Sequence, residues 1–410
     1  MNVADLKSEI AARKAALRGA LDVRTLFADV ADELGRAAAE IGARAADGEC
    51  VVPEIAYADI LAGTISAASK DAVSRHGCAV VREVFPRQDV AAWNRELSDY
   101  VKRNDYAAKA RAKAGLDSYF AGLTSGRPQI YGIYWSKPQV AARQSESLTA
   151  TRQWLNELWH SRRGPGVDFD PEQLCTYADR IRQREPGDAT LGLSPHTDGG
   201  SVERWLDPAF REVYAGVFSA DWRTYDPFDA AHRPEVREIP SPAVCRMFRT
   251  YQGWTALTEQ GPGDGTLRLL PLPNAIVYVL LRPLCDDVPD DSLCDAAPGR
   301  ALGIVERWHA PLLRGIVSIP AVYPGDTVWW HPDLVHAVED VHRGRSDSNV
   351  MYISSAPDCA KNRAFLELQK PAFSAGRSCP DFAPEDYEMD FAGRATVDDL
   401  NALGRRQMGF

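Results

Sequence analysis

The chain has 410 residues and a formal net charge of −10, with 45% hydrophobic and 25% charged residues. This composition is that of a folded globular protein and excludes disorder, collagen or a coiled coil as a description of the whole chain. No apolar run reaches the length of about 18 residues that a membrane-spanning helix needs, and the acidic N-terminus does not fit a signal peptide. We therefore expect a cytoplasmic protein that binds small molecules, with neither a membrane nor a nucleic acid polymer as partner.

The N-terminal part of the chain has a helical pattern. Residues 3–46 are rich in Ala, Arg, Leu and Glu, and their apolar residues recur at helical spacing, which predicts about two helices packed on the main body. The pattern further predicts a helix over residues 57–74, a β-branched strand over 76–85, and helices over 89–104 and 147–160.

The segment from about residue 177 to 356 has a different character, because short apolar runs alternate with clusters of Gly, Pro and Asp. Many short strands at this spacing indicate a sandwich or barrel. We expect a mainly β fold with flanking helices, divided into an N-terminal helical segment (1–70), a core domain (71–370) and a C-terminal extension (371–410). The predicted strands cover residues 178–182, 249–257, 266–270, 276–281, 315–319, 327–330 and 350–354.

The eight cysteines are scattered along the chain, and no two of them form a Cys-x-x-Cys pair. This spacing does not fit a zinc ribbon. In a chain without an export signal, the pattern favours reduced thiols over disulfides.

One candidate metal site begins at His196, in the segment Ser-Pro-His-Thr-Asp-Gly-Gly. Side chains two residues apart on a strand lie on the same face, so His196 and Asp198 could bind one divalent ion. The two glycines that follow allow the backbone to turn away tightly. A His-x-Asp pair by itself is more often an ordinary surface pair, so this motif needs a third ligand.

A second motif supplies that ligand. A Pro-Gly-Asp turn at 324–326 precedes an aromatic strand, a second turn at 331–333 and then His336. Two histidines and one carboxylate leave open positions on a metal, as in the facial triad of non-haem Fe(II) oxygenases. His331 lies close to His336 in the sequence, but its neighbours Trp330 and Pro332 favour a packed side chain.

These motifs resemble those of a known family. The pattern His-x-Asp … Pro-Gly-Asp-x(9)-His is similar to the Fe(II)/2-oxoglutarate dioxygenases of the phytanoyl-CoA-hydroxylase-like superfamily, and residues 265–271 resemble its Gly-x-Leu-x-x-x-Pro strand. Residues 179–187, 195–205 and 248–257 resemble the YbiU-like branch. The resemblance covers about residues 70–370.

The resemblance implies a double-stranded β-helix (jelly-roll) core in which His196, Asp198 and His336 hold Fe(II). It further implies that 2-oxoglutarate and O2 are co-substrates, with release of succinate and CO2. The expected reaction is hydroxylation of the substrate, or another oxidation that begins with hydrogen abstraction. The Asp ligand argues against the halogenase variant, in which a small residue replaces this carboxylate.

The residue that anchors 2-oxoglutarate departs from the family pattern. The superfamily usually places an arginine about ten residues beyond the distal histidine, where this chain has Asp-Ser-Asn at 347–349. An arginine suits this role because its planar fork binds a carboxylate through two hydrogen bonds. Arg345 is the first candidate, and Arg182, Arg180 and Arg268 on predicted neighbouring strands are rivals.

Other residues are candidates for contacts with the co-substrate or substrate. Thr255 and Trp254 lie on a strand that we expect beside the metal, and Gln252 shares a face with Trp254. Arg204 follows the first metal motif closely and is a candidate substrate ligand, although a surface ion pair with Glu203 is the simpler interpretation. The several arginines favour a small, polar, anionic substrate such as an amino acid or a nucleotide.

Two alternative functions stay open at this point. One is a cupin-like metalloenzyme that does not use 2-oxoglutarate, which the absent arginine favours. The other is a non-catalytic small-molecule-binding protein with the same jelly-roll fold. The sequence does not decide between a monomer and a homodimer, because the N-terminal helices could pack on their own core or on a second subunit.

Overall fold

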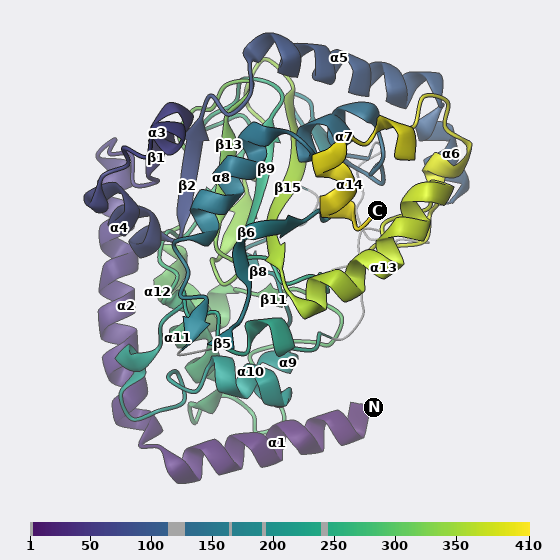
Figure 1. The fold of residues 1–410 in the computed structure, drawn as a ribbon. Coiled ribbons are helices and arrows are strands. Elements are labelled where there is room, and N and C mark those ends of the chain that lie inside the picture. Colours follow the sequence, from purple (N-terminus) through teal and green to yellow (C-terminus); the bar gives the residue numbers. More distant parts are fainter. Residues whose placement is uncertain (1–2, 114–127, 164–165, 191–193, 239–244) are drawn as a thin grey trace.

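A computed structural model of the chain describes residues 3–113, 128–163, 166–190, 194–238 and 245–410. Two β-sheets form its centre (Figure 1). The larger sheet has the order β1 (Glu54–Ala56), β2 (Cys78–Arg82), β13 (Thr327–Trp330), β9 (Tyr251–Ala256), β15 (Ser348–Asp358), β7 (Ile181–Arg184) and β3 (Ile130–Tyr131), with β6 (Asp170–Cys175) on the far end of β15. The smaller sheet has the order β11 (Leu302–Gly303), β8 (His196–Thr197), β14 (His336–Val338), β10 (Leu267–Leu269) and β12 (Val317–Ser318).

From β7 to β15 the strands alternate between the two sheets, except that β10, β11 and β12 all lie in the smaller sheet. The chain passes from β7 in the larger sheet to β8 in the smaller one, then to β9, to β10 and β12, to β13, to β14 and finally to β15. Side chains from both sheets form one buried cluster, which includes Trp254, Leu267, Leu269 and Trp330. This cluster holds the sheets together through apolar burial. A separate small hairpin joins β4 (Arg162–Arg163) to β5 (Gly166–Val167).

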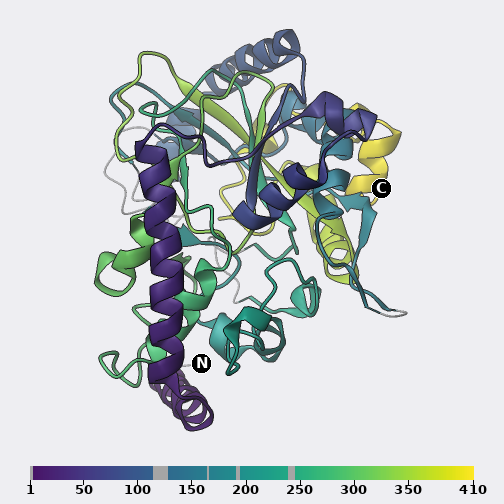
Figure 2. The ribbon, with the colours of Figure 1, turned by 90° about the vertical axis from the view of Figure 1, so that its left-hand side faces the viewer.

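The two N-terminal helices confirm the prediction for residues 3–46. They are α1 (Val3–Ala20) and α2 (Val23–Ala46), separated at Asp22, whose side chain accepts a hydrogen bond from the backbone N–H of Thr25 and caps α2. One stripe of α2 is buried at helical spacing, against α11 (Ala275–Leu281) and α12 (Glu306–Leu313). Figure 2 shows α2 running along one side of the molecule. The domain division of the chain stays a prediction.

The other helices surround the sheets. Near the C-terminus, α13 (Ala360–Ala375) and α14 (Ala402–Met408) lie on the side of the molecule away from α2 (Figure 1). The rest are α3 (Tyr57–Ala62), α4 (Ala67–His76), α5 (Arg87–Arg103), α6 (Tyr106–Ala112), α7 (Lys137–Arg143), α8 (Glu146–Asn156), α9 (Glu203–Leu206) and α10 (Pro208–Val213), with short 3-10 turns at Trp222–Thr224, Arg233–Glu235, Arg282–Leu284, Tyr387–Asp390 and Val397–Asp399.

The structure corrects the expectation of a mainly β chain, since the described helices contain more residues than the described strands. The predicted strand at 276–281 is also wrong, because it lies in helix α11, where every residue is buried. A short, fully buried apolar run has no period that separates strand from helix, which explains the error. The predicted helix at 57–74 is two helices, interrupted where Gly63 has a φ of 65°. In the part of the chain that the structure describes, no helix is long and apolar enough to cross a membrane.

Candidate metal centre

The pairing of β8 with β14 brings two histidines together from positions far apart in the sequence. His196 on β8 lies directly opposite His336 on β14, and their ring centroids are 4.3 Å apart. The His336 side chain is 8% exposed and that of His196 is 13% exposed. The two rings therefore meet at the edge of a largely buried site.

Asp198 completes the group from the loop that follows β8. One of its carboxylate oxygens, Oδ1, lies 3.7 Å from His196 Nε2, and the other, Oδ2, lies 3.5 Å from His336 Nε2. The three ligand atoms lie within 4.8 Å of one another, and no other group of three such side chains occurs among the described residues. The structure thus brings together the three residues that the sequence predicts as metal ligands.

Backbone carbonyls set the protonation of both imidazoles. His196 Nδ1 lies 2.7 Å from the carbonyl oxygen of Ser194, and His336 Nδ1 lies 3.1 Å from that of Leu334. A carbonyl can only accept, so each Nδ1 carries the hydrogen and donates it. Each Nε2 then presents a lone pair to the space beside Asp198, which is the arrangement found for metal-bound histidine.

The charges of the site suit a divalent cation. Burial, with a further contribution from the charge of His336, lowers the pKa of His196 to about 4. Burial by itself would raise the pKa of Asp198, but the adjacent imidazoles of His336 and His196 and the guanidinium of Arg249 hold that pKa below its usual value. At neutral pH the site therefore has a neutral imidazole at His196 and a carboxylate at Asp198. Two imidazole nitrogens and one carboxylate fit Fe(II) and leave coordination positions for other ligands.

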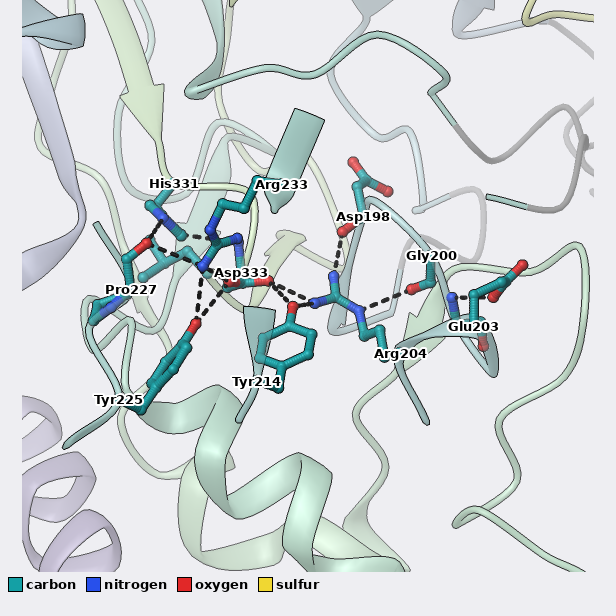
Figure 3. Close-up of polar contacts among 12 residues, drawn as sticks. Asp198, Gly200, Glu203, Arg204, Tyr214, Tyr225, Pro227, Arg233, His331 and Asp333 are labelled. Carbon is teal, nitrogen blue, oxygen red and sulfur yellow. Dashed lines mark hydrogen bonds and ion pairs between the residues drawn. The ribbon is translucent and has the colours of Figure 1, made fainter. Parts of the chain in front are cut away.

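Arg204 holds the backbone of this site in place (Figure 3). Its Nη2 donates to the carbonyl oxygen of Asp198 at 2.6 Å, and its Nε donates to that of Gly200 at 3.0 Å. Its Nη1 donates to Tyr214 and, at 2.5 Å, to the carboxylate of Asp333. All three nitrogens of the guanidinium are thus engaged, which does not leave Arg204 available as the substrate ligand that we expected.

Asp333 is the centre of a buried network on the far side of Arg204 (Figure 3). Its carboxylate accepts hydrogen bonds from Arg204, Arg233, Tyr214 and Tyr225, the last three at 2.8 to 3.0 Å. Burial by itself would raise the pKa of Asp333, but the two guanidinium groups lower it far more. The network connects the loop of Asp198 to the turn that precedes His336.

His331 belongs to the same network and does not lie with the ligand atoms. Its Nδ1 accepts from the backbone N–H of Asp333 at 3.0 Å, and its Nε2 donates to the carbonyl oxygen of Pro227 at 2.9 Å. Its ring also stacks on Trp159, with the centroids 4.8 Å apart. Burial lowers its pKa to about 3, so the ring is neutral and packed.

A cavity opens from the three ligands into the space between the sheets. Arg182 on β7 lines it and is 3% exposed, yet its Nε and Nη2 have no hydrogen-bond partner. Gln252 on β9 also lines the cavity; its Oε1 accepts from Trp330 Nε1 at 2.8 Å, while its Nε2 has no partner. Trp254 and Tyr352 complete this part of the wall. Buried polar groups are nearly always hydrogen-bonded, so these two orphaned donors indicate a place for a polar ligand.

The structure separates the other predicted residues into two groups. Arg180 lines the cavity with Arg182, and its guanidinium lies 4.1 Å from the centroid of the Phe382 ring. Three predicted residues do not line it: Arg268, Thr255 and Arg345. Arg268 lies between two inward-facing leucines on β10 and donates to the carbonyl oxygen of Ile316, and Thr255 is one residue from the inward-facing Trp254. Both therefore lie on the opposite faces of their strands.

Arg345 was our first candidate for the anchor, but the structure does not bring it to the metal centre. It is exposed in the loop between β14 and β15. The loop bends at residues 344–346, and the side chains at 345–347 are exposed.

Arg249, which no sequence pattern singled out, lines the cavity together with Asp198. A strand running from 249 to 257 would place Arg249 on the face opposite Gln252 and Trp254, so strand alternation gave no reason to select it. The observed strand β9 begins only at Tyr251, and the irregular backbone before it directs Arg249 into the cavity. The one signal in the sequence was its presence in the family-like segment 248–257.

Comparisons with known proteins agree with the sequence motifs. A family described as Gig2-like matches residues 4–410, and the chain belongs to this family. The uncharacterized protein YbiU of Escherichia coli (strain K12) is 44% identical over 409 residues, which are 99% of this chain and 97% of the relative. The resemblance to YbiU-like proteins is thereby confirmed.

The structure of this chain is also similar to solved structures of related proteins. The crystal structure titled "Putative Oxidoreductase from Salmonella typhimurium LT2" has a TM-score of 0.94 and 43% identity, over 99% of this chain and 98% of that one. GlcNAc Inducible Gene 2 from Candida albicans has a TM-score of 0.80 and 27% identity, over 98% of this chain and 88% of that one.

Proposed function

We propose that this member of the Gig2-like family is an Fe(II)- and 2-oxoglutarate-dependent oxygenase that hydroxylates a small polar metabolite. The observation that carries the proposal is the convergence of His196, Asp198 and His336 at the mouth of a cavity that also contains an orphaned arginine. The description of the Salmonella relative as an oxidoreductase supports the same class of reaction.

The strand order supports a double-stranded β-helix core. The strands β7, β15, β9 and β13 are neighbours in the larger sheet, and β8, β14, β10 and β12 are neighbours in the smaller one. Successive strands alternate between the sheets, as in a jelly roll of eight strands. In this arrangement β8 and β14 are adjacent, which is why ligands from two distant motifs meet.

The residues of the cavity fit 2-oxoglutarate. This dicarboxylate needs one carbonyl–carboxylate end near the metal and a cation for its distal carboxylate. Arg182 provides an unpaired guanidinium between the sheets, and the unpaired Nε2 of Gln252 is a further donor. A planar guanidinium that binds a carboxylate forms two strong hydrogen bonds, which offsets the cost of its burial. We propose that Arg182, and not Arg345, binds the distal carboxylate of 2-oxoglutarate.

The protein's own groups have defined tasks in this proposal. The Ser194 and Leu334 carbonyls keep both imidazoles in the metal-binding tautomer, and Arg204 fixes the loop of Asp198. When Fe(II) and 2-oxoglutarate are bound, they supply the redox chemistry: O2 oxidises 2-oxoglutarate to succinate and CO2, and one substrate C–H bond becomes C–OH.

Anaerobic titration tests the proposal. The protein is loaded with Fe(II) and then with 2-oxoglutarate, and the visible charge-transfer band of the iron–2-oxoglutarate chelate is recorded. We expect a band that requires both components and is lost in His196→Ala and His336→Ala. His160→Ala is the control, because the His160 side chain is 73% exposed. Iron binding without a band would favour a metalloenzyme that does not use 2-oxoglutarate, and absence of iron binding would contradict the metal site itself.

A further inference from the structure

Two hollows meet at the metal centre. The cavity described above contains Arg182 and Tyr352, and a second, smaller hollow is lined by apolar side chains that include Phe210, Met247 and Phe248. Asp198, Cys245 and Arg249 line both hollows, so they form the boundary between the two. A molecule in the second hollow would therefore lie beside a metal held by Asp198, across from a co-substrate in the first.

Five arginines line the two hollows, and most of them already have partners. Arg204 and Arg233 both pair with the buried carboxylate of Asp333. Arg180 has its Nε 3.6 Å from the Asp179 carboxylate and lies over the Phe382 ring. These three guanidinium groups are held by the protein itself.

The guanidinium groups of the other two arginines differ: Arg182 Nε and Nη2 have no hydrogen-bond partner, and the Arg249 side chain forms no ion pair with the described residues. Arg249 has only a ring contact, with its guanidinium carbon 5.5 Å from the centroid of Tyr177. Among the described residues, the site thus has two guanidinium groups without an anionic partner. 2-Oxoglutarate, once it chelates the metal, has one carboxylate left for a cation.

We propose that Arg249 binds the carboxylate of the primary substrate, which is a small carboxylic acid with an apolar chain. This inference rests on the proposed function and names the substrate class of the same site. A carboxylate matches the planar fork of the guanidinium. The remainder of the acid enters the second hollow, where Phe210, Met247 and Phe248 provide apolar contacts.

The polar residues of the second hollow do not compete for this substrate. Arg204, Arg233 and Asp333 satisfy one another, and Glu238 is paired with Lys361 at 2.8 Å. The Asp333 carboxylate compensates one of the two guanidinium charges and Lys361 compensates Glu238, so the cluster keeps one net positive charge, which also favours an anionic ligand. Besides Asp198, Cys245 and Arg249 at the boundary, the side chains that offer contacts to the rest of a ligand are the apolar ones. A polar substrate without an apolar part would gain little from such a wall.

Metal binding strengthens the attraction of Arg249 for an anion. The negative charge nearest to the centre is Asp198, which raises the pKa of Arg249 together with Cys245, Tyr177 and Asp179, against the lowering effect of burial. A divalent cation on Asp198 neutralises that charge. The other nearby carboxylate, Asp179, lies 3.6 Å from Arg180 Nε, so a substrate carboxylate can supply a counter-ion for Arg249.

The first test is direct binding, which needs neither 2-oxoglutarate nor turnover. The full chain is loaded with Co(II), and the binding of hexanoate is measured by calorimetry, with hexanamide as the uncharged match. We expect hexanoate to bind and hexanamide not to bind. We expect Arg249→Gln to raise the dissociation constant of hexanoate by about tenfold or more, because a charge-assisted hydrogen-bonded pair is lost. Arg249→Lys should retain part of the affinity, because it keeps the positive charge. Equal binding of acid and amide, or unchanged binding by Arg249→Gln, would overturn the proposal.

The second test separates the two arginines. The dissociation constant of 2-oxoglutarate is measured on the Fe(II) protein from the charge-transfer band. We expect it to rise about tenfold or more in Arg182→Gln and to change little in Arg249→Gln. An equal loss in both variants would make Arg249 part of the co-substrate site and overturn its role toward the substrate. A wild-type protein that shows no band but binds hexanoate through Arg249 would contradict the oxygenase proposal and leave the carboxylate site standing.

The third test uses turnover. Leucine, hexanoate and their primary amides, together with hexyl phosphate, are compared for stimulation of succinate release. We expect the acids to stimulate and the amides not to, with the stimulation lost in Arg249→Gln. Stimulation by hexyl phosphate in preference to the acids, or by none of the acids, would contradict the assignment of a carboxylate.

Discussion

Arg204 and Asp333 form an ion pair of 2.5 Å in which each side chain is only 1% exposed. The pair links the two segments that carry the metal ligands, because Arg204 also holds the carbonyl of Asp198 and Asp333 lies in the turn that leads to His336. Two such charges remain buried together because four donors satisfy the carboxylate. The metal centre therefore depends on groups that do not themselves touch the metal.

We predict that Asp333→Asn destabilises the protein strongly. The substitution keeps the shape of the side chain but leaves the guanidinium groups of Arg204 and Arg233 buried without an anion. Breaking a buried pair in this way typically costs about 3–5 kcal/mol. Urea denaturation measures the change in the free energy of unfolding. The control is Asp291→Asn, which removes an exposed pair with Lys7 and should change the free energy of unfolding far less. Similar costs for the two variants would contradict the central role of Asp333.

We predict opposite effects for two arginines of the same strand. Arg182→Met should stabilise the ligand-free protein, by about 1–3 kcal/mol, because a buried group with unpaired donors is replaced by an apolar one of similar length. Arg184→Met should destabilise it, because Arg184, which is 1% exposed, donates to the carbonyls of Gly265, Glu339 and Asp188. Thermal and urea unfolding of both variants without ligand provide the comparison. Loss of stability in Arg182→Met would indicate that this guanidinium has a structural partner and no vacancy for a ligand.

The anchor of 2-oxoglutarate gives a further prediction, on which sequence and structure differ. Arg345→Gln should leave the affinity of the Fe(II) protein for 2-oxoglutarate unchanged, since Arg345 is exposed and does not line the cavity. The measurement is a titration of the charge-transfer band. A marked rise in the dissociation constant would mean that the loop between β14 and β15 closes over the site and that Arg345 is the anchor.

The last prediction concerns pH and Glu388, a buried residue in the C-terminal part of the chain. Its carboxyl accepts hydrogen bonds from Tyr100 and from the backbone N–H groups of Tyr134 and Trp135, but burial outweighs them and raises its pKa to about 7. Since the folded pKa lies above the unfolded one, the stability that Glu388 contributes is present at low pH and is lost as the pH rises through about 7.

Glu388→Gln should therefore remove part of this pH dependence. The stability of the variant relative to the wild type should increase from pH 5 to pH 8, by up to about 3 kcal/mol for a shift of this size. Urea unfolding at both pH values measures the difference. Glu9→Gln, at an exposed position, serves as the control for loss of one charge. A constant difference between Glu388→Gln and wild type would show that Glu388 titrates alike in both states.

The metal ligands were predictable because local sequence patterns encode them. The i, i+2 spacing of His196 and Asp198 places both on one face of an extended segment, and the turn at 324–326 marks the strand that leads to His336. The helix pair at 3–46 was predictable for the same reason, since its periodic burial is a local property. The family-like motifs then identified these two distant segments as parts of one site.

Other features needed the tertiary structure. Helix α11 replaced a predicted strand because it is buried on every side, which removes the alternation that would have identified it. The choice of arginine shows the same limit. The sequence around each candidate does not tell which one reaches the metal cavity, because all four lie near predicted strands: Arg345, Arg268, Arg182 and Arg249.

The sequence by itself determined the chemistry of the ligands and the presence of many short strands, because these depend on residues that are close together in the chain. Only the tertiary structure decided which guanidinium groups reach the metal cavity. That choice depends on the pairing of β8 with β14, on the face that each strand turns inward, and on where β9 begins. Each of these is set by contacts between residues far apart in the sequence, where small shifts in register reverse the direction of a side chain.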